Sequence, residues 1–478
     1  MPYEIVIGLE IHAELNTKSK IFCGCKNEFG GEPNSNCCPV CLGMPGTLPV
    51  LNKEAVIYAI KAGLAMNCRI SEVSKMDRKN YFYPDMPKAY QVSQYDIPLC
   101  YDGYVEIEAD GQTKNIGIER IHLEEDAGKL MHDPNGQGTL IDYNRAGVPL
   151  IEIVTRPDIR SPKEARVLFE NIKSILEYTG VCDCQMQEGS LRADVNLSVR
   201  PTGQETLGTR TEMKNLNSFR AVERACEAEA KRQIELLEKG LKVVQETRRW
   251  DDSKQESYPM REKEESLDYR FFPEPDLVPI VVDKTLIKNI KASIPELPGA
   301  RKKRYINELE IPAYDANIIT SDMKIADFFE EATKVCSNYK LVSNWLLTDL
   351  LRLVKEKGQD VMQKLTAQKF GELMVYYDKG EISQASAKKV LDIVSETGEE
   401  PGSLIERLEL KVQRDENLVE SIVKKVVQDN PKAVSDYKSG KTKAFGFLMG
   451  RVMAQLKGNG DPEQIKRLLT RELKSLME

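Results

Sequence analysis

Residues 4–15 near the N-terminus form a period-two stretch, in which polar and apolar residues alternate from Leu9 onwards. Successive side chains of a strand point to opposite faces, so this segment predicts a strand with Glu10, His12 and Glu14 on one face and apolar residues on the other. Two carboxylates and an imidazole on one face must be solvated, paired or bound to a metal, because burying unpaired charge is costly. The segment therefore indicates either an ordinary solvated sheet face or a metal site.

Two later segments repeat this design. Residues 191–199 alternate in the same way and put Arg192, Asp194 and Asn196 on one face. An Asp and an Asn two residues apart on a strand suit Mg²⁺ beside phosphate oxygens. Glu152 stands between isoleucines in an otherwise apolar run, so it is a candidate for a buried carboxylate.

Residues 120–129 form the third polar segment, in which acidic residues run into a Gly-Lys turn. Strand alternation puts Glu124 on the same side as His122, but a turn beginning there could bring Glu125 inward instead, and the sequence leaves both arrangements open. Taken singly, each of these acids is more often a paired structural carboxylate. Together they favour a carboxylate-rich Mg²⁺ site.

A group of cysteines gives the most specific metal signal. Cys23 and Cys25 are separated by 12 residues from Cys38 and Cys41, which is the spacing of a small zinc ribbon or knuckle. Four thiolates would close the coordination sphere and make the zinc structural. Free thiols are the alternative, and Cys37 could replace Cys38 as a ligand.

Turn residues and helical periodicity divide the chain. Up to about residue 295, short apolar runs alternate with turn dipeptides such as Asp102-Gly103 and Asp110-Gly111, and helices are expected near 52–67, 162–179 and 218–239. Beyond residue 300 the apolar residues recur at helical spacing. We predict an α+β protein with a mostly antiparallel cradle domain over 1–295, a helical domain over 296–405 and a helical tail domain over 406–478.

Composition narrows the class of protein. The 478 residues are 41% hydrophobic and 30% charged, which is typical of globular chains with more than one core. No apolar run of about 18 residues and no secretory signal is visible, and eleven cysteines fit a reducing compartment, so we expect a cytoplasmic protein without membrane contact. The net charge of −7 argues against nonspecific binding of long nucleic acid.

The C-terminal segment 432–474 differs from the rest of the chain in its charge. It holds ten Lys and Arg against four Asp and Glu, giving +6. A basic tail on an acidic chain indicates a polyanionic partner, although a solvated helical surface would have the same composition.

Phosphate-binding loops of the familiar kinds are absent from the sequence, so cations for a nucleotide would have to come from scattered side chains. Residues 78–90, including Lys79 and Lys88, combine cations and aromatic rings that suit adenine, phosphates or an unstacked RNA end, although such a loop could equally cover a core. Lys214 precedes an expected helix N-terminus and is a further anion-binding candidate. No nucleophile elbow or Cys-His pair is supported, so any ammonia used here must be made elsewhere.

Six long segments, in order along the chain, carry a family resemblance. They read VIGLEIH at 6–12, RKNYFYPD at 78–85, EEDAGK at 124–129, EGSLR at 188–192, YRFFPEPD at 269–276 and KTKAFGFLMG at 441–450. The chain resembles, over its whole length, the B-subunit family of the bacterial aspartyl/glutamyl-tRNA(Asn/Gln) amidotransferases.

The resemblance implies a subunit that uses ATP and Mg²⁺ to phosphorylate the side-chain carboxylate of Glu or Asp misacylated on tRNA(Gln) or tRNA(Asn). Ammonia would then convert the acyl phosphate to an amide. It also implies a heterotrimer, in which an amidase-type A subunit supplies ammonia and a small C subunit joins the two, and a tail that holds the tRNA body.

The candidate residues follow from both lines of reasoning. We expect the catalytic metal to be held by Glu10, His12 and Glu125, with Glu124, Glu152 and Asp194 as further candidates, and zinc by Cys23, Cys25, Cys38 and Cys41. Lys79 joins Glu10, His12 and Glu125 as a catalytic candidate, and the phosphate or acceptor-end candidates are Lys88, Arg192, Asn196 and Lys214. A noncatalytic tRNA-binding scaffold and a stand-alone metallohydrolase are the competing hypotheses.

Overall fold

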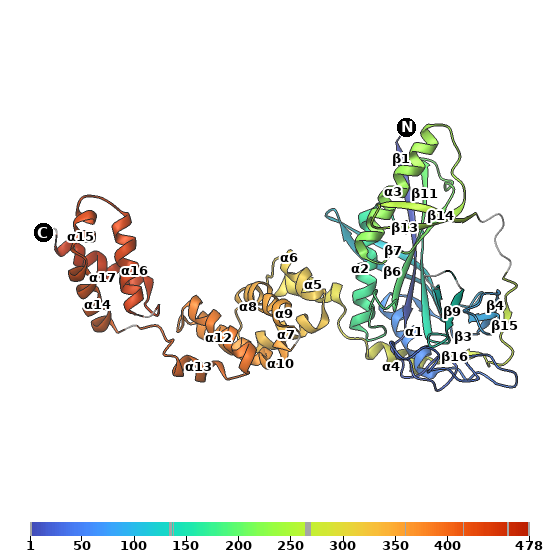
Figure 1. Ribbon diagram of the computed structural model, residues 1–478, viewed down its shortest axis with the longest axis horizontal. Helices are drawn as coiled ribbons and strands as arrows, with labels where there is room; N and C mark the ends of the chain where they lie inside the picture. The colour runs from blue at the N-terminus through green and yellow to red at the C-terminus, as the bar shows by residue number, and fades with distance from the viewer. Residues whose placement is uncertain are drawn as a thin grey trace. The chain divides into compact units, whose positions relative to one another are not determined.

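The computed structural model describes residues 2–132, 136, 138–262, 269–358, 360–413, 415–456 and 458–476. The chain forms two compact units, Met1–Gly299 and Ala300–Glu478 (Figure 1). The first unit contains all the described strands, and the second is helical. This arrangement confirms the predicted α+β class.

The elements of the first unit have the following bounds. The strands are β1 (Tyr3–Glu14), β2 (Arg69–Ile70), β3 (Val73–Ser74), β4 (Asp77–Asn80), β5 (Tyr90–Ser93), β6 (Cys100–Ala109), β7 (Gln112–Glu125), β8 (Lys129–His132), β9 (Thr139–Asp142), β10 (Pro149–Thr155), β11 (Leu191–Pro201), β12 (Thr211–Lys214), β13 (Glu246–Asp251), β14 (Glu256–Glu262), β15 (Phe272–Pro273) and β16 (Ile280–Val281). The helices are α1 (Lys53–Ala65), α2 (Pro162–Tyr178), α3 (Phe219–Glu238) and α4 (Lys284–Ala292).

One large sheet organises this unit. Its described strands lie in the order β14-β13-β12-β11-β1-β10-β7-β6-β2, so the N-terminal strand β1 is the centre of the sheet. Within the described strands, only β12 and β13 pair in parallel, as predicted for a mostly antiparallel sheet. A three-stranded sheet of β15-β4-β5 and two two-stranded sheets accompany it.

The two faces of the large sheet differ in chemistry, as the alternation in β1 predicts. Leu9 and Ile11 are buried in the core that helices α1, α2 and α3 form against the sheet (Figure 1). Each such side chain contributes about 1.5–3 kcal/mol on burial. A slip of one residue would turn Glu10 and His12 into this core, so the register of β1 is strongly specified.

The predicted helices of this unit are confirmed, and their ends follow the capping residues. Helix α2 begins after Ser161, whose side chain accepts a hydrogen bond from the Glu164 backbone N–H at 3.2 Å. Helix α3 begins after Ser218, which accepts from the Ala221 N–H at 3.0 Å. Each cap pairs one N–H that the first turn would otherwise leave without a partner.

The two turn predictions had different outcomes. Asp110 and Gly111 connect β6 to β7 with φ of 51° and 74°, as expected for a tight hairpin. The Asp102-Gly103 prediction was wrong, because this dipeptide lies inside β6. A Cβ on Gly103 would stand 2.3 Å from the Cys68 sulfur, so close packing, and not a turn, requires glycine there.

The second unit contains the remaining helices. They are α5 (Pro298–Glu308), α6 (Ala313–Thr320), α7 (Met323–Val335), α8 (Tyr339–Trp345), the π-helix η1 (Leu346–Leu350), α9 (Leu351–Lys357), α10 (Val361–Lys364), α11 (Ala367–Asp378), α12 (Gln384–Thr397), α13 (Pro401–Arg407), α14 (Glu416–Asp429), α15 (Pro431–Lys438), α16 (Lys443–Gln455) and α17 (Pro462–Ser475). No helix in the described parts of the chain combines the length and apolarity needed to cross a bilayer.

The described residues of this unit form two hydrophobic clusters. One includes residues from Tyr305 to Leu410, and the other residues from Val419 to Leu473. The division of the chain into three domains, with a boundary near residue 405, stays a prediction.

Candidate active site and metal centre

Strand register brings distant polar residues together on the face opposite the helices. His12 of β1 is paired with Glu152 of β10 on one side and with Arg192 of β11 on the other. Glu152 is in turn paired with His122 of β7. Side chains at paired positions share a face, so three strands besides β1 contribute to one polar surface.

His12 lies at the centre of this surface. Its Nε2 atom is 3.6 Å from Glu124 Oε1, 3.6 Å from Glu152 Oε2 and 3.8 Å from Glu10 Oε1. The Glu124 side chain is only 4% exposed, against 29% for Glu10, so the cluster is buried at one end and open at the other. We call Glu10, His12, Glu124, Glu152 and Asp194 the acidic cluster.

The electrostatics of the acidic cluster favour a cation. Burial raises the pKa of Glu124, and the neighbouring Glu152 carboxylate raises it further. Burial and Glu152 likewise raise the pKa of Glu10. Burial lowers the pKa of His12, but the hydrogen bond to Glu152 and the charges of Glu124 and Glu152 outweigh this effect and raise it to about 9. Crowded, desolvated carboxylates take up positive charge, either as protons or as a metal ion.

The donor atoms of the acidic cluster could hold such an ion. His12 forms one group with Glu124 and Glu152 and another with Glu10 and Asp194, and within each group the ligand atoms lie within 4.8 Å of one another. Carboxylate oxygens predominate, which suits a hard cation such as Mg²⁺. The predicted metal-ligand candidates Glu10, His12, Glu124, Glu152 and Asp194 are therefore brought together.

Glu125 is not part of this cluster. Its carboxylate forms an ion pair with Lys88 and accepts a hydrogen bond from the Val92 backbone N–H at 2.8 Å. Strand alternation continues to the end of β7, so Glu124 faces His12 and Glu125 points elsewhere. Of the two arrangements that the sequence left open, the structure has the first.

Two of the predicted phosphate ligands are neutralised by acids of the same face. Lys214 Nζ lies 2.6 Å from Asp194 Oδ2 and 3.1 Å from Glu212, because β12 aligns it with β11. Arg192 donates to Asp126 Oδ2 at 2.8 Å. Asn196 lies on β11 in register with Gly8 of β1.

The four cysteines predicted to bind zinc lie together. The sulfur atoms of Cys23, Cys25, Cys38 and Cys41 are within 4.8 Å of one another, and those of Cys38 and Cys41 are 3.9 Å apart. Zn–S bonds of about 2.3 Å in a tetrahedron give sulfur separations of about 3.8 Å, so the group could hold zinc. Cys37 instead has its sulfur 3.7 Å from Asn144 Oδ1. We call the four residues the cysteine cluster.

Cys41 is the thiol of the cysteine cluster whose pKa is lowered. The hydrogen bond from Cys23 lowers the pKa of Cys41, whereas burial raises it. Hydrogen bonding to the Cys38 backbone and the charge of Lys20 lower this pKa further, to about 4. A thiolate is the form that binds metal.

Two family models match the chain. The GatB/GatE catalytic domain matches residues 5–288, and the GatB domain matches residues 327–473. The chain belongs to the GatB/GatE family. The acidic cluster and the cysteine cluster both lie within the catalytic-domain match.

Relatives within the family are similar over their whole length. The chain is 57% identical over 480 residues to a protein of Caldicellulosiruptor saccharolyticus, covering 100% of both chains. It is 57% identical to a protein of a Thermoanaerobacter species, covering 99% of this chain and 100% of the relative. It is 53% identical to a protein of Carboxydothermus hydrogenoformans, covering 99% of both chains. All three are named as the B subunit of an aspartyl/glutamyl-tRNA(Asn/Gln) amidotransferase, so this GatB/GatE chain is an enzyme of the amidotransferase ligase class.

Lys79 has a different environment from the other predicted phosphate ligands of this GatB/GatE chain, Lys88, Arg192 and Lys214. Its ammonium lies 5.0 Å from the centre of the Tyr269 ring and 6.0 Å from that of Tyr81, and within the described residues it has no ion pair with a carboxylate. Its charge lowers the pKa of Glu124, so the two groups interact. Tyr269 is held here by a hydrogen bond from the Asn80 N–H to its carbonyl, at 3.0 Å.

His122 is the functional candidate that the sequence interpretation did not select. It is buried, and its Nε2 lies 3.3 Å from Glu152 Oε2 and 3.8 Å from Glu124 Oε2. Its Nδ1 atom has no hydrogen-bond partner in the described structure. The alternation that puts His122 on the same face as Glu124 was the available signal.

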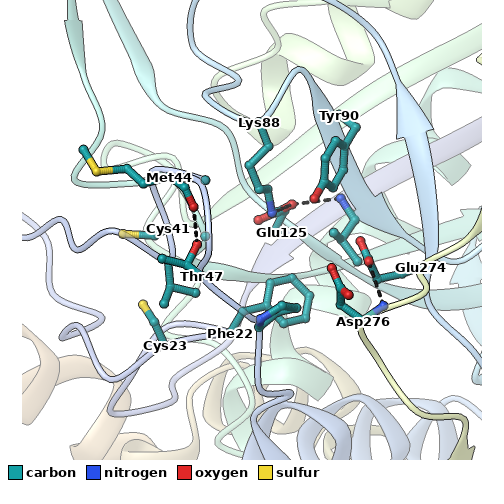
Figure 2. A pocket seen from close by; sticks show the side chains of 15 residues that line it. Phe22, Cys23, Cys41, Met44, Thr47, Lys88, Tyr90, Glu125, Glu274 and Asp276 are labelled. Atoms are coloured by element: carbon teal, nitrogen blue, oxygen red, sulfur yellow. Dashed lines mark hydrogen bonds and ion pairs between the residues drawn. The ribbon is translucent and has the colours of Figure 1, made fainter.

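A cavity of about 80 Å³ lies between the cysteine cluster and the ion pair of Lys88 and Glu125. Figure 2 shows Cys23 and Cys41 on one side of it and the Lys88–Glu125 pair on the other, with the Phe22 ring at its base. Lys88 also lies over this ring, 5.4 Å from its centre. This volume admits a few water molecules or a small substituent.

Proposed function

We propose that this chain phosphorylates the side-chain carboxylate of Glu or Asp misacylated on tRNA(Gln) or tRNA(Asn), using ATP and Mg²⁺. A carboxylate oxygen attacks the γ-phosphorus and ADP leaves; ammonia then attacks the acyl carbon and inorganic phosphate leaves. The observation that carries the proposal is the crowding of Glu10, Glu124 and Glu152 around His12 on a partly buried face. The names of the relatives supply the substrate class.

The residues of the acidic cluster would hold the metal. An Mg²⁺ ion held by these residues would supply positive charge to neutralise the phosphoryl oxygens of ATP. Glu10, His12 and Asp194 lie at the more open end, and Glu124 and Glu152 at the buried end. His122 orients Glu152 by the contact at 3.3 Å. The acyl phosphate would also have to be kept away from water, which would hydrolyse it.

Lys79 is the best-supported phosphate ligand among the predicted cations. Lys88, Arg192 and Lys214 each form an ion pair with a carboxylate, whereas Lys79 forms none within the described residues and lies beside aromatic rings. An ammonium without an acidic partner gains most from meeting a phosphate.

Ammonia would come from a glutaminase partner. The sequence shows no Gly-x-Ser-x-Gly elbow, and the buried acids around His12 are poor surroundings for a nucleophilic thiolate. We propose a heterotrimer with an amidase-type A subunit and a small C subunit, as the B-subunit names of the relatives suggest.

The C-terminal helices would hold the body of the tRNA. Their cations Lys432, Lys443, Arg451 and Lys466 are exposed, as phosphate contact requires. Lys457 belongs to the same basic segment but lies outside the described residues.

The test is a reconstituted complex with the A and C partners, supplied with Glu-tRNA(Gln), ATP and ammonium. We expect His12→Ala to lose both tRNA-dependent ATP hydrolysis and amide formation, by at least about 100-fold, while tRNA binding is retained. Full amide formation by His12→Ala would contradict the proposal and favour a noncatalytic scaffold. Hydrolytic turnover by the wild type without ATP or tRNA would favour a metallohydrolase.

A further inference from the structure

Lys20 is a lysine buried beside the cysteine cluster. Lys20 is only 1% exposed, and its side chain is among the largest of the fully buried ones. The ammonium donates a hydrogen bond to the Asn36 carbonyl at 2.9 Å and to the Tyr143 carbonyl at 3.5 Å. Its third neighbour is the sulfur of Cys41, at 3.8 Å.

The charge of Lys20 is not balanced by an acid. In the part of the chain that the structure describes, no carboxylate forms an ion pair with its ammonium. Two backbone carbonyls satisfy hydrogen bonds but supply no formal charge, and burying an ammonium without an anion is strongly unfavourable. The Cys41 sulfur is therefore the nearest group that can become the counter-ion.

The cysteine cluster has the opposite imbalance when it holds a divalent metal. Four thiolates around Zn²⁺ leave two surplus negative charges in a partly buried place. One buried ammonium next to a ligand sulfur offsets one of these charges. The two unfavourable groups stabilise each other, and neither is readily accommodated without the other.

We propose that Lys20 is the counter-ion of a zinc–thiolate centre formed by Cys23, Cys25, Cys38 and Cys41. Lys20 is a positioning residue in this centre and does not ligate the metal. Loss of Lys20 weakens zinc binding, and loss of zinc leaves Lys20 without an anion. The proposal does not depend on the kinase function, because no substrate takes part in it.

The same ammonium connects the metal centre to the loop at residues 143–147. Tyr143 accepts from Lys20, and the Ile21 N–H donates to the Gly147 carbonyl at 2.9 Å. Between them, Arg145 donates to the carbonyls of Ala127 and Gly128 at 3.0 and 2.8 Å, just beyond β7. Loss of zinc is therefore expected to loosen the segment that follows the acids of β7.

The first test uses the full chain with Lys20→Met, which removes the charge and shortens the unbranched side chain by only one atom. Competition with a chromogenic chelator is expected to show zinc binding at least about tenfold weaker than in the wild type. The absorption bands of Co²⁺ bound in place of zinc report whether the thiolate ligands are retained. Lys18→Met, an exposed lysine two residues away, is the matched control and should bind zinc like the wild type.

Unchanged zinc affinity in Lys20→Met would overturn the proposal, as would a wild-type chain that binds neither zinc nor cobalt. A second measurement covers the case in which Lys20→Met does not fold. Wild-type chain is acetylated under native conditions before and after zinc extraction, and each lysine is followed by peptide mass spectrometry. Lys20 should be protected with zinc and reactive without it, while Lys18 reacts in both states. Equal reactivity of Lys20 in both states would refute the counter-ion role.

Discussion

The Nε2 atom of His122 lies 3.3 Å from Oε2 of Glu152, with both residues buried in the middle of the large sheet. An imidazole that contacts a metal-ligand candidate in this way fixes the direction of its carboxylate. His122 thus holds Glu152 of the acidic cluster in place and has a positioning role.

Replacing His122 should raise the metal requirement of the enzyme. Without the imidazole, Glu152 can turn away, so His122→Ala should need about 10–100 times more Mg²⁺ for half-maximal ATP hydrolysis in the reconstituted complex. Partial rescue by His122→Gln, which restores a donor, would mark a positioning role. An unchanged Mg²⁺ titration curve would argue against it, and His132→Ala on β8 is the matched control.

Removing the Lys79 ammonium should weaken ATP binding. A charged hydrogen bond contributes about 1.5–3 kcal/mol, so Lys79→Ala should raise the KM for ATP roughly 10- to 100-fold. Lys114→Ala, which removes a lysine paired with Glu164, should leave this KM unchanged. If both variants behave alike, Lys79 does not contact phosphate.

The adjacent residues Cys37 and Cys38 should differ in their importance for zinc binding and stability. Cys38→Ser should lose zinc and lower the free energy of unfolding by more than about 2 kcal/mol, a fraction of the roughly 10–16 kcal/mol that structural zinc can supply. Cys37→Ser should keep both, since its sulfur faces Asn144. Metal analysis and thermal denaturation measure the two effects, and equal zinc loss in both variants would contradict this assignment.

An ion-pair network in the helical unit should make its stability depend on pH. Burial alone would raise the pKa of Glu330, but hydrogen bonds from Arg301, Arg304 and Tyr305 lower it to about 2. The folded pKa is below the ordinary value of 4.5, so the stabilisation is present above pH 4.5 and is lost as the pH falls towards 2.

Glu330→Gln should therefore destabilise this unit at pH 7 by about 1–3 kcal/mol, and the difference from the wild type should shrink below pH 4.5. Denaturant unfolding at several pH values measures this difference in the free energy of unfolding. The exposed neighbour Glu331 pairs only with Lys334 in the described structure, so Glu331→Gln should change little. A difference that persists undiminished at low pH would contradict the network.

The basic tail should bind tRNA through phosphates. Reversing two exposed cations, Lys443→Glu with Lys466→Glu, should weaken tRNA binding at low salt and reduce the slope of log affinity against log salt by about 2. The matched control is Lys284→Glu with Lys288→Glu on α4 of the first unit. Equal losses in both pairs would indicate a general effect of charge and not a tRNA-binding tail.

Local sequence patterns were sufficient to predict several helices, strands and turns, and to predict which face of strand β1 is polar. The alternation around Glu10 and His12 predicted both the strand and its polar side, because the period of a strand is a property of a few neighbouring residues. The cap at Ser161 and the hairpin at Asp110-Gly111 were equally local. The family resemblance added an activity that no local pattern could indicate.

Pairing between distant residues was decided by the tertiary structure. The sequence could not choose between Glu124 and Glu125, nor between Cys37 and Cys38, because each choice depends on which segment packs opposite. It also offered Lys79, Lys88, Arg192 and Lys214 together as cation candidates, although only the tertiary structure shows that the last three already have acidic partners.

What the sequence by itself determined, then, was the α+β class, the helices near 52–67, 162–179 and 218–239, the polar face of β1 and four cysteines at the spacing of a zinc site. Only the tertiary structure decided that His122 supports Glu152 and that Lys20 is buried against Cys41. The burial of Lys20 and the pairing of its charge depend on residues that are distant in the sequence. Its ammonium donates to the carbonyl of Tyr143, for example, which is more than a hundred residues away. Such contacts form only when the sheet brings those segments together.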